Sequence, residues 1–141
     1  MKEETGMFDT KIAIVLRNNL ASWQKLNVTA FLSSGIFGQH PEIIGEPYRD
    51  RAGNLYHALS IQPMIVLSAD EDTIATIHRR SLERGVPSSL FIEEMFVTGH
   101  DAANRAVFSE YAPEDAKVVG IALRADKKIV DKITKGATMD H

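Results

Sequence analysis

Apolar residues occur on both alternating faces of three short segments, and this pattern predicts strands that are covered on both sides. The three segments are Lys11–Arg17, Pro63–Ser68 and Val118–Leu123, and Ser88–Ile92 is predicted as a further strand. Strands of this kind are typical of the centre of an α/β sheet that has helices on either side. The pattern therefore predicts a sheet of about four core strands.

Helix signals follow the first two of these strands. Asn27 is placed to cap a short helix over Val28–Ser34, and Gly35 would end it. Ser68 and Glu71 match a capping box, which predicts a helix to about Glu83. Two short strands around residues 51–54, Arg-Ala-Gly-Asn, predict a hairpin between these two units.

Two more helices are predicted, one from Asp101 through Tyr111 and the other over Asp126–Thr134. Residues 1–9 have the character of a loose, charged leader. The alternation of strands and helices predicts a three-layer α/β/α fold with a mixed, mostly parallel sheet and a small hairpin insertion. A length of 141 residues suits a single α/β domain over residues 1–141.

Composition narrows the function classes. The chain has no cysteine, which excludes disulfides, thiolate metal sites and cysteine nucleophiles. A net charge of −3 gives no global basic surplus, so a nucleic-acid partner is not expected. No apolar run is long enough to span a membrane, and the acidic start is unlike a signal peptide. We therefore expect a cytoplasmic protein without a membrane anchor.

In open α/β sheets, ligands bind beyond the carboxyl ends of the central strands. Glu93-Glu94 at one strand end is either a general base half-removed from water or a solvated pair that ends the strand. Lys25 either helps to hold an anion near a helix N-terminus or is a surface lysine. Thr98 either donates a hydrogen bond in a crevice or serves its own loop. The residues past the strand ends are Arg17, Asn18, Asn19, Ser68, Glu93, Glu94 and Arg124.

The histidines offer no metal site, because none has a partner at metal-ligand spacing. His57 alternates with apolar residues, which favours a core histidine over a ligand. His78 begins a basic cluster with Arg79 and Arg80 that is expected to face solvent or, less readily, a polyanion. No phosphate-binding loop, dinucleotide motif or serine elbow is present, so no cofactor is predicted.

Three segments resemble the type II peptidyl-tRNA hydrolases, the archaeal and eukaryotic class. KIAIVLRNNL resembles their first strand, PMIVLSADEDTIATIHRRSLERGVPSSLFIEE their second strand, helix and third strand, and VVGIALRADKKIVDKITKG their last strand and helix. A closer likeness is to a bacterial family of unknown function that shares this fold.

The resemblance implies residue roles. Type II hydrolases have a functional lysine after the first strand, and Lys25 is the lysine available there. They also have an aspartate after the third strand and a threonine four residues later, a spacing that Glu94 and Thr98 keep. The chain departs from their pattern, because no glycine surrounds Lys25 and residues 28–34 contain neither Gln nor His. Lys25, Glu94 and Thr98 are thus the implied catalytic set.

Three functions remain open at this point. The first is a protein that binds a small anionic or peptide-like ligand, with Arg17, Asn18, Asn27 and Glu93 as its ligand-binding residues. The second is an ester or amide hydrolase in which Glu94 is the base and Lys25 stabilises charge. The third is a structural or interaction subunit. Type II hydrolases are typically dimers, and the resemblance therefore implies a homodimer.

Overall fold

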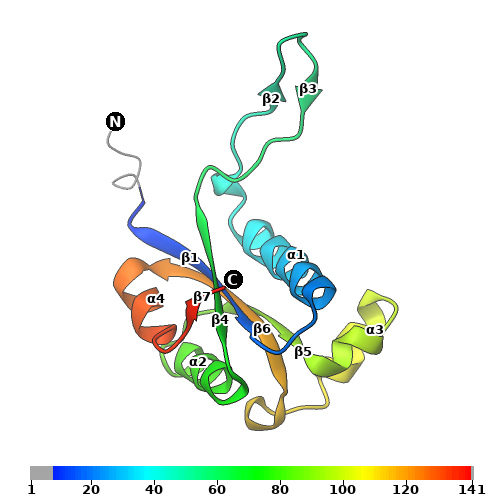
Figure 1. Ribbon diagram of the computed structural model, residues 1–141, viewed down its shortest axis with the longest axis vertical. Helices are drawn as coiled ribbons and strands as arrows, with labels where there is room; N and C mark the ends of the chain where they lie inside the picture. The colour runs from blue at the N-terminus through cyan, green and yellow to red at the C-terminus, as the bar shows by residue number, and fades with distance from the viewer. Residues whose placement is uncertain (1–7, 141) are drawn as a thin grey trace.

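The computed structural model of the protein describes residues 8–140 and shows a five-stranded sheet between two layers of helices (Figure 1). The strand order is β5-β6-β1-β4-β7. The predicted leader falls largely on residues 1–7, which lie outside the described part of the chain. The strands of the sheet are β1 (Thr10–Arg17), β4 (Met64–Ala69), β5 (Ser88–Ile92), β6 (Val118–Asp126) and β7 (Thr138–Met139).

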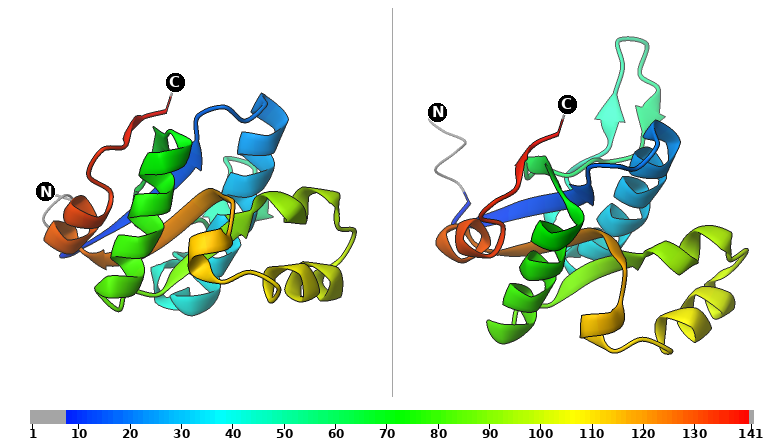
Figure 2. Two further views of the ribbon diagram at one scale, coloured as in Figure 1. Left: turned by 90° about the horizontal axis from the view of Figure 1, so that it is seen from below. Right: turned by 60° about the horizontal axis from the view of Figure 1, so that its bottom comes forward.

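Helices cover both faces of this sheet, as the two-faced strands predicted (Figure 2). Helix α1 (Ser22–Gln39) packs Val28, Leu32 and Ile36 on one face. Helices α2 (Glu71–Glu83) and α4 (Lys127–Ile133) pack on the other. A mixed, three-layer α/β/α arrangement is therefore confirmed, and removal of these apolar side chains from water is its main source of stability.

The directions of the strands differ from the prediction of a mostly parallel sheet. Strand β4 runs parallel to β1, but β6 runs antiparallel to both β1 and β5. The short strand β7 is antiparallel to β4, so three of the four neighbouring pairs in the described sheet are antiparallel. The reason is that the connection between β5 and β6, residues 93–117, stays at the end of the sheet where β5 finishes, so β6 starts beside Ile92 and runs in the opposite direction.

Helix α1 is more than twice the length predicted for it. Asn27 and Gly35, the expected cap and stop, both lie inside the helix. The helix begins instead at Ser22, where the Gln24 side chain accepts a 2.9 Å hydrogen bond from the Ala21 N–H. A Cβ at Gly35 would lie 2.2 Å from Ser89 Oγ, so this glycine permits close packing on β5 rather than ending the helix.

Other helix boundaries also shift. Asp70, not Ser68, caps α2 by accepting a 2.8 Å hydrogen bond from the Thr73 N–H. Helix α3 (Asp101–Phe108) is capped by His100 and ends before Tyr111. Asp126 caps α4 through the Lys128 N–H, close to the predicted start. Short 3-10 turns cover Pro41–Ile43, Glu93–Val97 and Pro113–Asp115, where no structure was predicted.

The predicted hairpin is confirmed and projects away from the body of the molecule as an arm, residues 44–62 (Figure 1). Its strands, β2 (Tyr48–Arg49) and β3 (Leu55–Tyr56), pair antiparallel. The Asp50 carboxylate organises the turn, because it accepts hydrogen bonds from the Ala52 and Asn54 N–H groups and from the Tyr56 hydroxyl. These bonds lower the pKa of Asp50 to about 2, with the Tyr56 hydroxyl as the largest cause.

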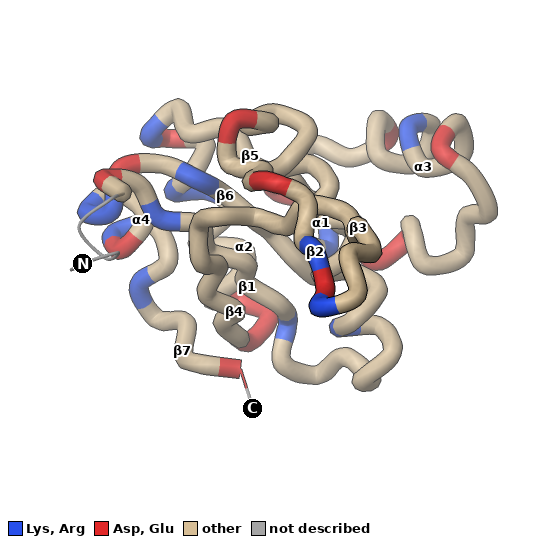
Figure 3. Tube along the Cα trace, turned by 90° about the horizontal axis from the view of Figure 1, so that it is seen from above, with Lys and Arg blue, Asp and Glu red and all other residues tan. Residues whose placement is uncertain are grey.

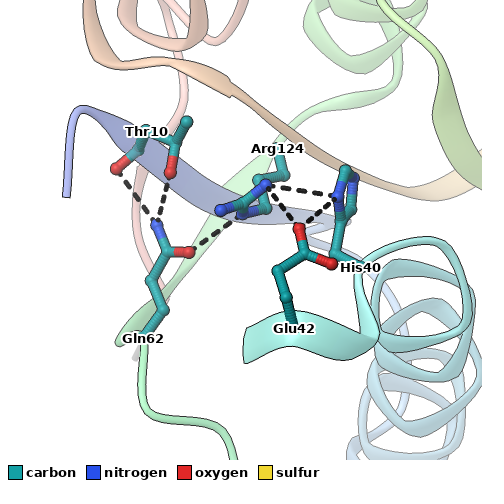
Figure 4. A network of polar contacts seen from close by, with 5 residues as sticks. All are labelled: Thr10, His40, Glu42, Gln62 and Arg124. Atoms are coloured by element: carbon teal, nitrogen blue, oxygen red, sulfur yellow. Dashed lines mark hydrogen bonds and ion pairs between the residues drawn. The ribbon is translucent and has the colours of Figure 1, made fainter. Parts of the chain in front are cut away.

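A polar network holds the base of this arm at the amino end of β1 (Figure 4). Arg124 Nε donates to Gln62 Oε1 at 2.9 Å, and its Nη1 lies 3.2 Å from His40 Nδ1. Gln62 Nε2 in turn donates to the Thr10 carbonyl and hydroxyl oxygens, both at 3.1 Å. The Glu42 carboxylate is 3.8 Å from Arg124. The network therefore joins both ends of the arm to the sheet.

Candidate site at the carboxyl ends of the strands

Strands β1, β4 and β5 run in one direction and finish at the same edge of the sheet, so the residues after them are neighbours in space. This is the edge at which α/β sheets usually bind ligands. Two polar clusters are found there. One follows β1 and β4 around Lys25, and the other joins the ends of β1 and β5 through Arg17.

The first cluster centres on a carboxylate from the end of the chain. Asp140 Oδ1 accepts a 3.0 Å hydrogen bond from Lys25 Nζ and a 2.6 Å hydrogen bond from Ser68 Oγ. The Lys25 and Asp140 side chains are each 21% exposed, so water screens this ion pair only partly. Ser68 is the residue that the capping-box pattern had assigned to a helix start, but it lies in β4 and faces the cluster.

Strand β7 is what brings Asp140 to this edge. Thr138 and Met139 pair with the end of β4, and the Asp140 N–H donates to the Val66 carbonyl at 3.2 Å. The chain reaches β7 from α4 through Gly136, whose φ of +104° lies where residues with a side chain are strained. A two-residue strand shows no periodicity of apolar residues, so β7 was not predicted and Asp140 was not recognised as a candidate site residue.

A cavity of about 400 Å³ opens beside this cluster. The backbone N–H groups at the start of α2 are close by, but Asp70 already caps them, and this bond lowers the pKa of the Asp70 carboxyl. The charged groups of the lining are the ammonium of Lys25 and the carboxylates of Asp70 and Asp140. The lining residues are Asn18, Lys25, Ser68, Ala69, Asp70, Thr73, Gly136, Thr138, Met139 and Asp140.

The second cluster is an ion pair at the ends of β1 and β5. Arg17 Nη2 donates to Glu93 Oε2 at 2.9 Å, and Arg17 Nε donates to Asn19 Oδ1 at 2.7 Å. Arg17 is largely buried, whereas the Glu93 side chain is 43% exposed. The Asn18 N–H bonds the Ala69 carbonyl and so holds the loop after β1 against the end of β4. Four predicted positions, Arg17, Asn18, Asn19 and Glu93, thus lie at this edge.

The remaining predicted residues have other partners. Glu94 lies near Tyr111, and its Oε1 atom is buried without a hydrogen bond. Thr98 Oγ1 bonds the Met95 carbonyl and the Asn104 side chain. Within residues 8–140, no hydrogen bond or ion pair joins Lys25 to Glu94 or to Thr98. Asn27 is exposed on α1 and makes no side-chain bond to either cluster.

Three other expectations are wrong. Arg124 lies at the opposite end of the sheet, because β6 runs antiparallel and pairs Arg124 with Ile12. His57 is exposed, since the arm that carries it leaves the body of the molecule. His78 is buried and does not belong to a solvated basic face. In the described residues, no group of three or more His, Asp and Glu side chains could hold a metal ion.

Charge and hydropathy add two observations. Basic and acidic residues are interspersed along the trace (Figure 3). No helix within residues 8–140 is long and apolar enough to cross a membrane.

Comparisons with known proteins give a family and a near structural relative. Residues 10–140 match the model of a family described as "Protein of unknown function (DUF2000)". A solved structure of a protein of unknown function from Agrobacterium tumefaciens is 67% identical in sequence, with a TM-score of 0.95. The alignment covers 96% of this chain and 100% of that one. No curated protein matches the chain.

Proposed function

Because the chain belongs to the DUF2000 family, whose description gives no activity, we propose a function from geometry: the protein binds a small peptide-like ligand beside Lys25 and Asp140. The observation that carries this proposal is the convergence of the Lys25 ammonium and the Ser68 hydroxyl on one carboxylate at the edge of a polar cavity. Such a cavity presents both hydrogen-bond donors and acceptors at the edge where α/β sheets bind ligands.

The balance of charge favours a peptide-like ligand over a simple anion. An anion would meet the carboxylates of Asp70 and Asp140 as well as the Lys25 ammonium. A peptide terminus carries amide N–H and C=O groups and a charge of either sign, so it matches both kinds of lining residue. The Asp140 carboxylate already occupies the position in which a ligand carboxylate would meet Lys25 and Ser68.

The binding proposal is tested by an NMR titration with the dipeptide Ala-Ala, and with acetate and inorganic phosphate as separate probes. We expect Ala-Ala to shift the amide signals of Thr73, Gly136 and Thr138, and Lys25→Met to abolish the shifts. Lys11→Met is the matched control, because Lys11 also forms an ion pair, 2.7 Å from Asp131, but does not line this cavity. No shift with Ala-Ala up to about 10 mM, a weaker affinity than most biological binding, would contradict the proposal.

If acetate or phosphate shifts these signals while Ala-Ala does not, the ligand is an anion and the charge argument fails. If Lys25→Met and Lys11→Met bind Ala-Ala equally well, the ligand lies elsewhere. Each of these results overturns a different step of the proposal.

A hydrolase is the second candidate, and one observation favours it. The Ser68 hydroxyl and the Lys25 ammonium share the Asp140 carboxylate, which gives this edge a base and a positive charge within hydrogen-bond distance. The likeness of three segments to type II peptidyl-tRNA hydrolases supports the same edge. However, Glu94 and Thr98 contact α3 and the segment that follows it instead of Lys25. We therefore expect no hydrolysis of peptidyl-tRNA above background, and robust turnover that is lost in Lys25→Ala would reverse this choice.

The arm supports a separate proposal, association of two copies of this chain. Five of its large apolar side chains are more than half exposed, and an isolated two-stranded hairpin is marginally stable in water. Side chains of this size supply several hundred Å² per copy, approaching the roughly 800 Å² that each partner buries in a stable interface. The five are Tyr48, Leu55, Tyr56, Leu59 and Ile61.

Charge on the arm is consistent with a self-complementary contact. Residues 44–62 carry two acidic residues, Glu46 and Asp50, and two basic ones, Arg49 and Arg51, so two arms need not repel each other. We expect light scattering to give a dimer for the full chain and a monomer for the Leu55→Ser, Leu59→Ser double variant. Leu82→Ser, which removes an exposed leucine from α2, is the control. A monomeric parent chain, or a dimer unaffected by the arm variant, contradicts this proposal.

A further inference from the structure

A second cavity, of about 360 Å³, lies between α2, β5 and the chain that follows α3. It shares no lining residue with the cavity beside Lys25. Its walls are mostly apolar, and its size is within the range of small-molecule sites, at the lower end. The principal apolar residues of its lining are Leu82, Val86, Leu90, Ile92 and Phe108.

His78 is the buried polar group in this wall. It is 7% exposed, and its ring makes no hydrogen bond or ion pair with any residue of the described part of the chain. Only its backbone is bonded, through a 2.7 Å hydrogen bond that the carbonyl accepts from Ser81 Oγ. Among the described residues, the side-chain nitrogen or oxygen that is fully removed from solvent without a partner is Glu94 Oε1, so the unbonded ring nitrogens of His78 still reach solvent where the ring lines the cavity. A ligand in the cavity can therefore bond this ring in place of water.

The chemistry of the wall defines what that ligand can be. Burial lowers the pKa of His78, so at neutral pH the ring is uncharged and offers one N–H donor and one acceptor nitrogen. Across the cavity, burial and then the charge of Glu94 raise the pKa of Tyr111, which keeps its phenol neutral. Glu110 adds further negative charge near Tyr111. An anionic ligand would therefore be repelled and would find no cation in the lining.

We propose that this cavity binds a small, uncharged, largely apolar molecule whose single hydrogen-bonding group pairs with the His78 ring. The apolar part of the ligand would fill the space between Leu82, Leu90 and Phe108. This second site is independent of the peptide-like ligand proposed beside Lys25, and either proposal can fail alone.

Three probes of similar size separate the contribution of the hydrogen bond from those of apolar contact and of charge. The phenol 4-methylphenol carries the hydrogen-bonding group, toluene lacks it, and benzoate carries a charge. In NMR titrations of the full chain we expect 4-methylphenol to shift the His78 ring signals and the Leu82 and Leu90 methyl signals. Toluene should bind about tenfold more weakly, as expected for the loss of one hydrogen bond to a buried group, and benzoate more weakly still.

The variant His78→Phe keeps the size of the ring but removes its polar atoms. We expect it to bind 4-methylphenol about tenfold more weakly and toluene unchanged. His57→Phe, on the exposed arm, is the matched control and should bind like the parent chain. Leu82→Trp, at a position that is 52% exposed, tests the cavity without altering the core and should weaken both 4-methylphenol and toluene.

Three results would overturn the proposal. The first is the absence of any shift at Leu82, Leu90 and His78 with 4-methylphenol. The second is equal binding of 4-methylphenol to His78→Phe and to the parent chain, or, should that variant not fold, equal binding to Leu82→Trp. The third is tighter binding of benzoate, which would mean that the wall does not exclude an anion.

Discussion

The two ends of the sheet carry polar networks that are built from different parts of the chain. At the amino end, Arg124 and Gln62 join the sheet to the base of the arm, and Gln62 is almost fully buried (Figure 4). At the carboxyl end, Lys25 and Ser68 meet Asp140, which directly follows the two-residue strand β7. The first network holds long segments together, whereas the second borders a cavity and depends on a short one. The comparison therefore leads us to expect that one end contributes mainly to stability and that the other carries the binding proposed above.

The largest expected effect tests the amino end. Arg124→Met removes the guanidinium and leaves the buried Gln62 side chain without one of its partners. We expect the free energy of unfolding to fall by about 2–3 kcal/mol, since the loss combines hydrogen bonds and the charge that they carry. Urea denaturation measures this change in the free energy of unfolding. The control is Arg84→Met, at an exposed position after α2, which should change stability by less than about 0.5 kcal/mol. Equal stabilities of the two variants would remove the distinction between the ends.

Arg124 also shows what the sequence could and could not predict. The apolar faces of β1, β4 and β6 depend on burial alone, and local pattern predicted those strands and the three-layer arrangement correctly. Strand direction depends on the path of the chain outside the strand. Residues after β1 and β5 were therefore placed at the correct edge, while Arg124 was placed at the wrong one.

The site was less predictable than the fold for the same reason. Arg17 was found because it ends β1 and Lys25 because it follows that strand, but the partner of Lys25 is Asp140, 115 positions away. Two-residue strands such as β7 have no periodicity to detect, and their pairing is decided by the edge they meet. His78 was misassigned because its neighbours in sequence, Arg79 and Arg80, are charged, although its place on α2 turns it toward β5.

A smaller effect is expected from the other pair at the carboxyl end. Arg17→Met should lower the free energy of unfolding by about 1–2 kcal/mol, because Arg17 is buried but its partner Glu93 remains accessible to water. A double-mutant cycle with Glu93→Gln should give a coupling of about 1 kcal/mol. The exposed pair Arg105–Asp101 is the reference, with an expected coupling of about 0.3–0.5 kcal/mol. A coupling for Arg17–Glu93 no larger than this reference would show that the burial of Arg17 does not strengthen its ion pair.

Lys25→Met should change stability least among the three basic residues. Its ion pair with Asp140 is partly screened and holds only the last short strand, so we expect a loss below about 1 kcal/mol. The same variant should abolish binding of Ala-Ala, while Arg124→Met should leave that binding intact. Urea denaturation and the NMR titration, run on both variants, measure the two properties. A larger loss of stability in Lys25→Met, together with a loss of Ala-Ala binding in Arg124→Met, would reverse the roles of the two ends.

The smallest expected effect is on the pH dependence of stability, which can be compared between the two ends. Glu42 at the amino end has a pKa below its ordinary 4.5, chiefly through a backbone hydrogen bond and also through His40 and Arg124. Asp70 at the carboxyl end has a pKa below 3.8 because it accepts the Thr73 N–H. A carboxyl whose pKa is lowered by folding stabilises the protein above its unfolded pKa, and this contribution is lost as pH falls through the folded value.

Acid should therefore weaken both ends, and single variants separate their contributions. Between about pH 6 and pH 3, Glu42→Gln and Asp70→Asn should each flatten the fall in stability that the parent chain shows. If the Arg124 network were what lowers the pKa of Glu42, Glu42→Gln would have no further effect in the Arg124→Met background. Since the backbone hydrogen bond is the largest cause, we expect most of the flattening to persist in that background, as measured by urea denaturation across the pH series. A pH dependence that Arg124→Met alone removes would mean that the network, not the local turn, controls this carboxyl.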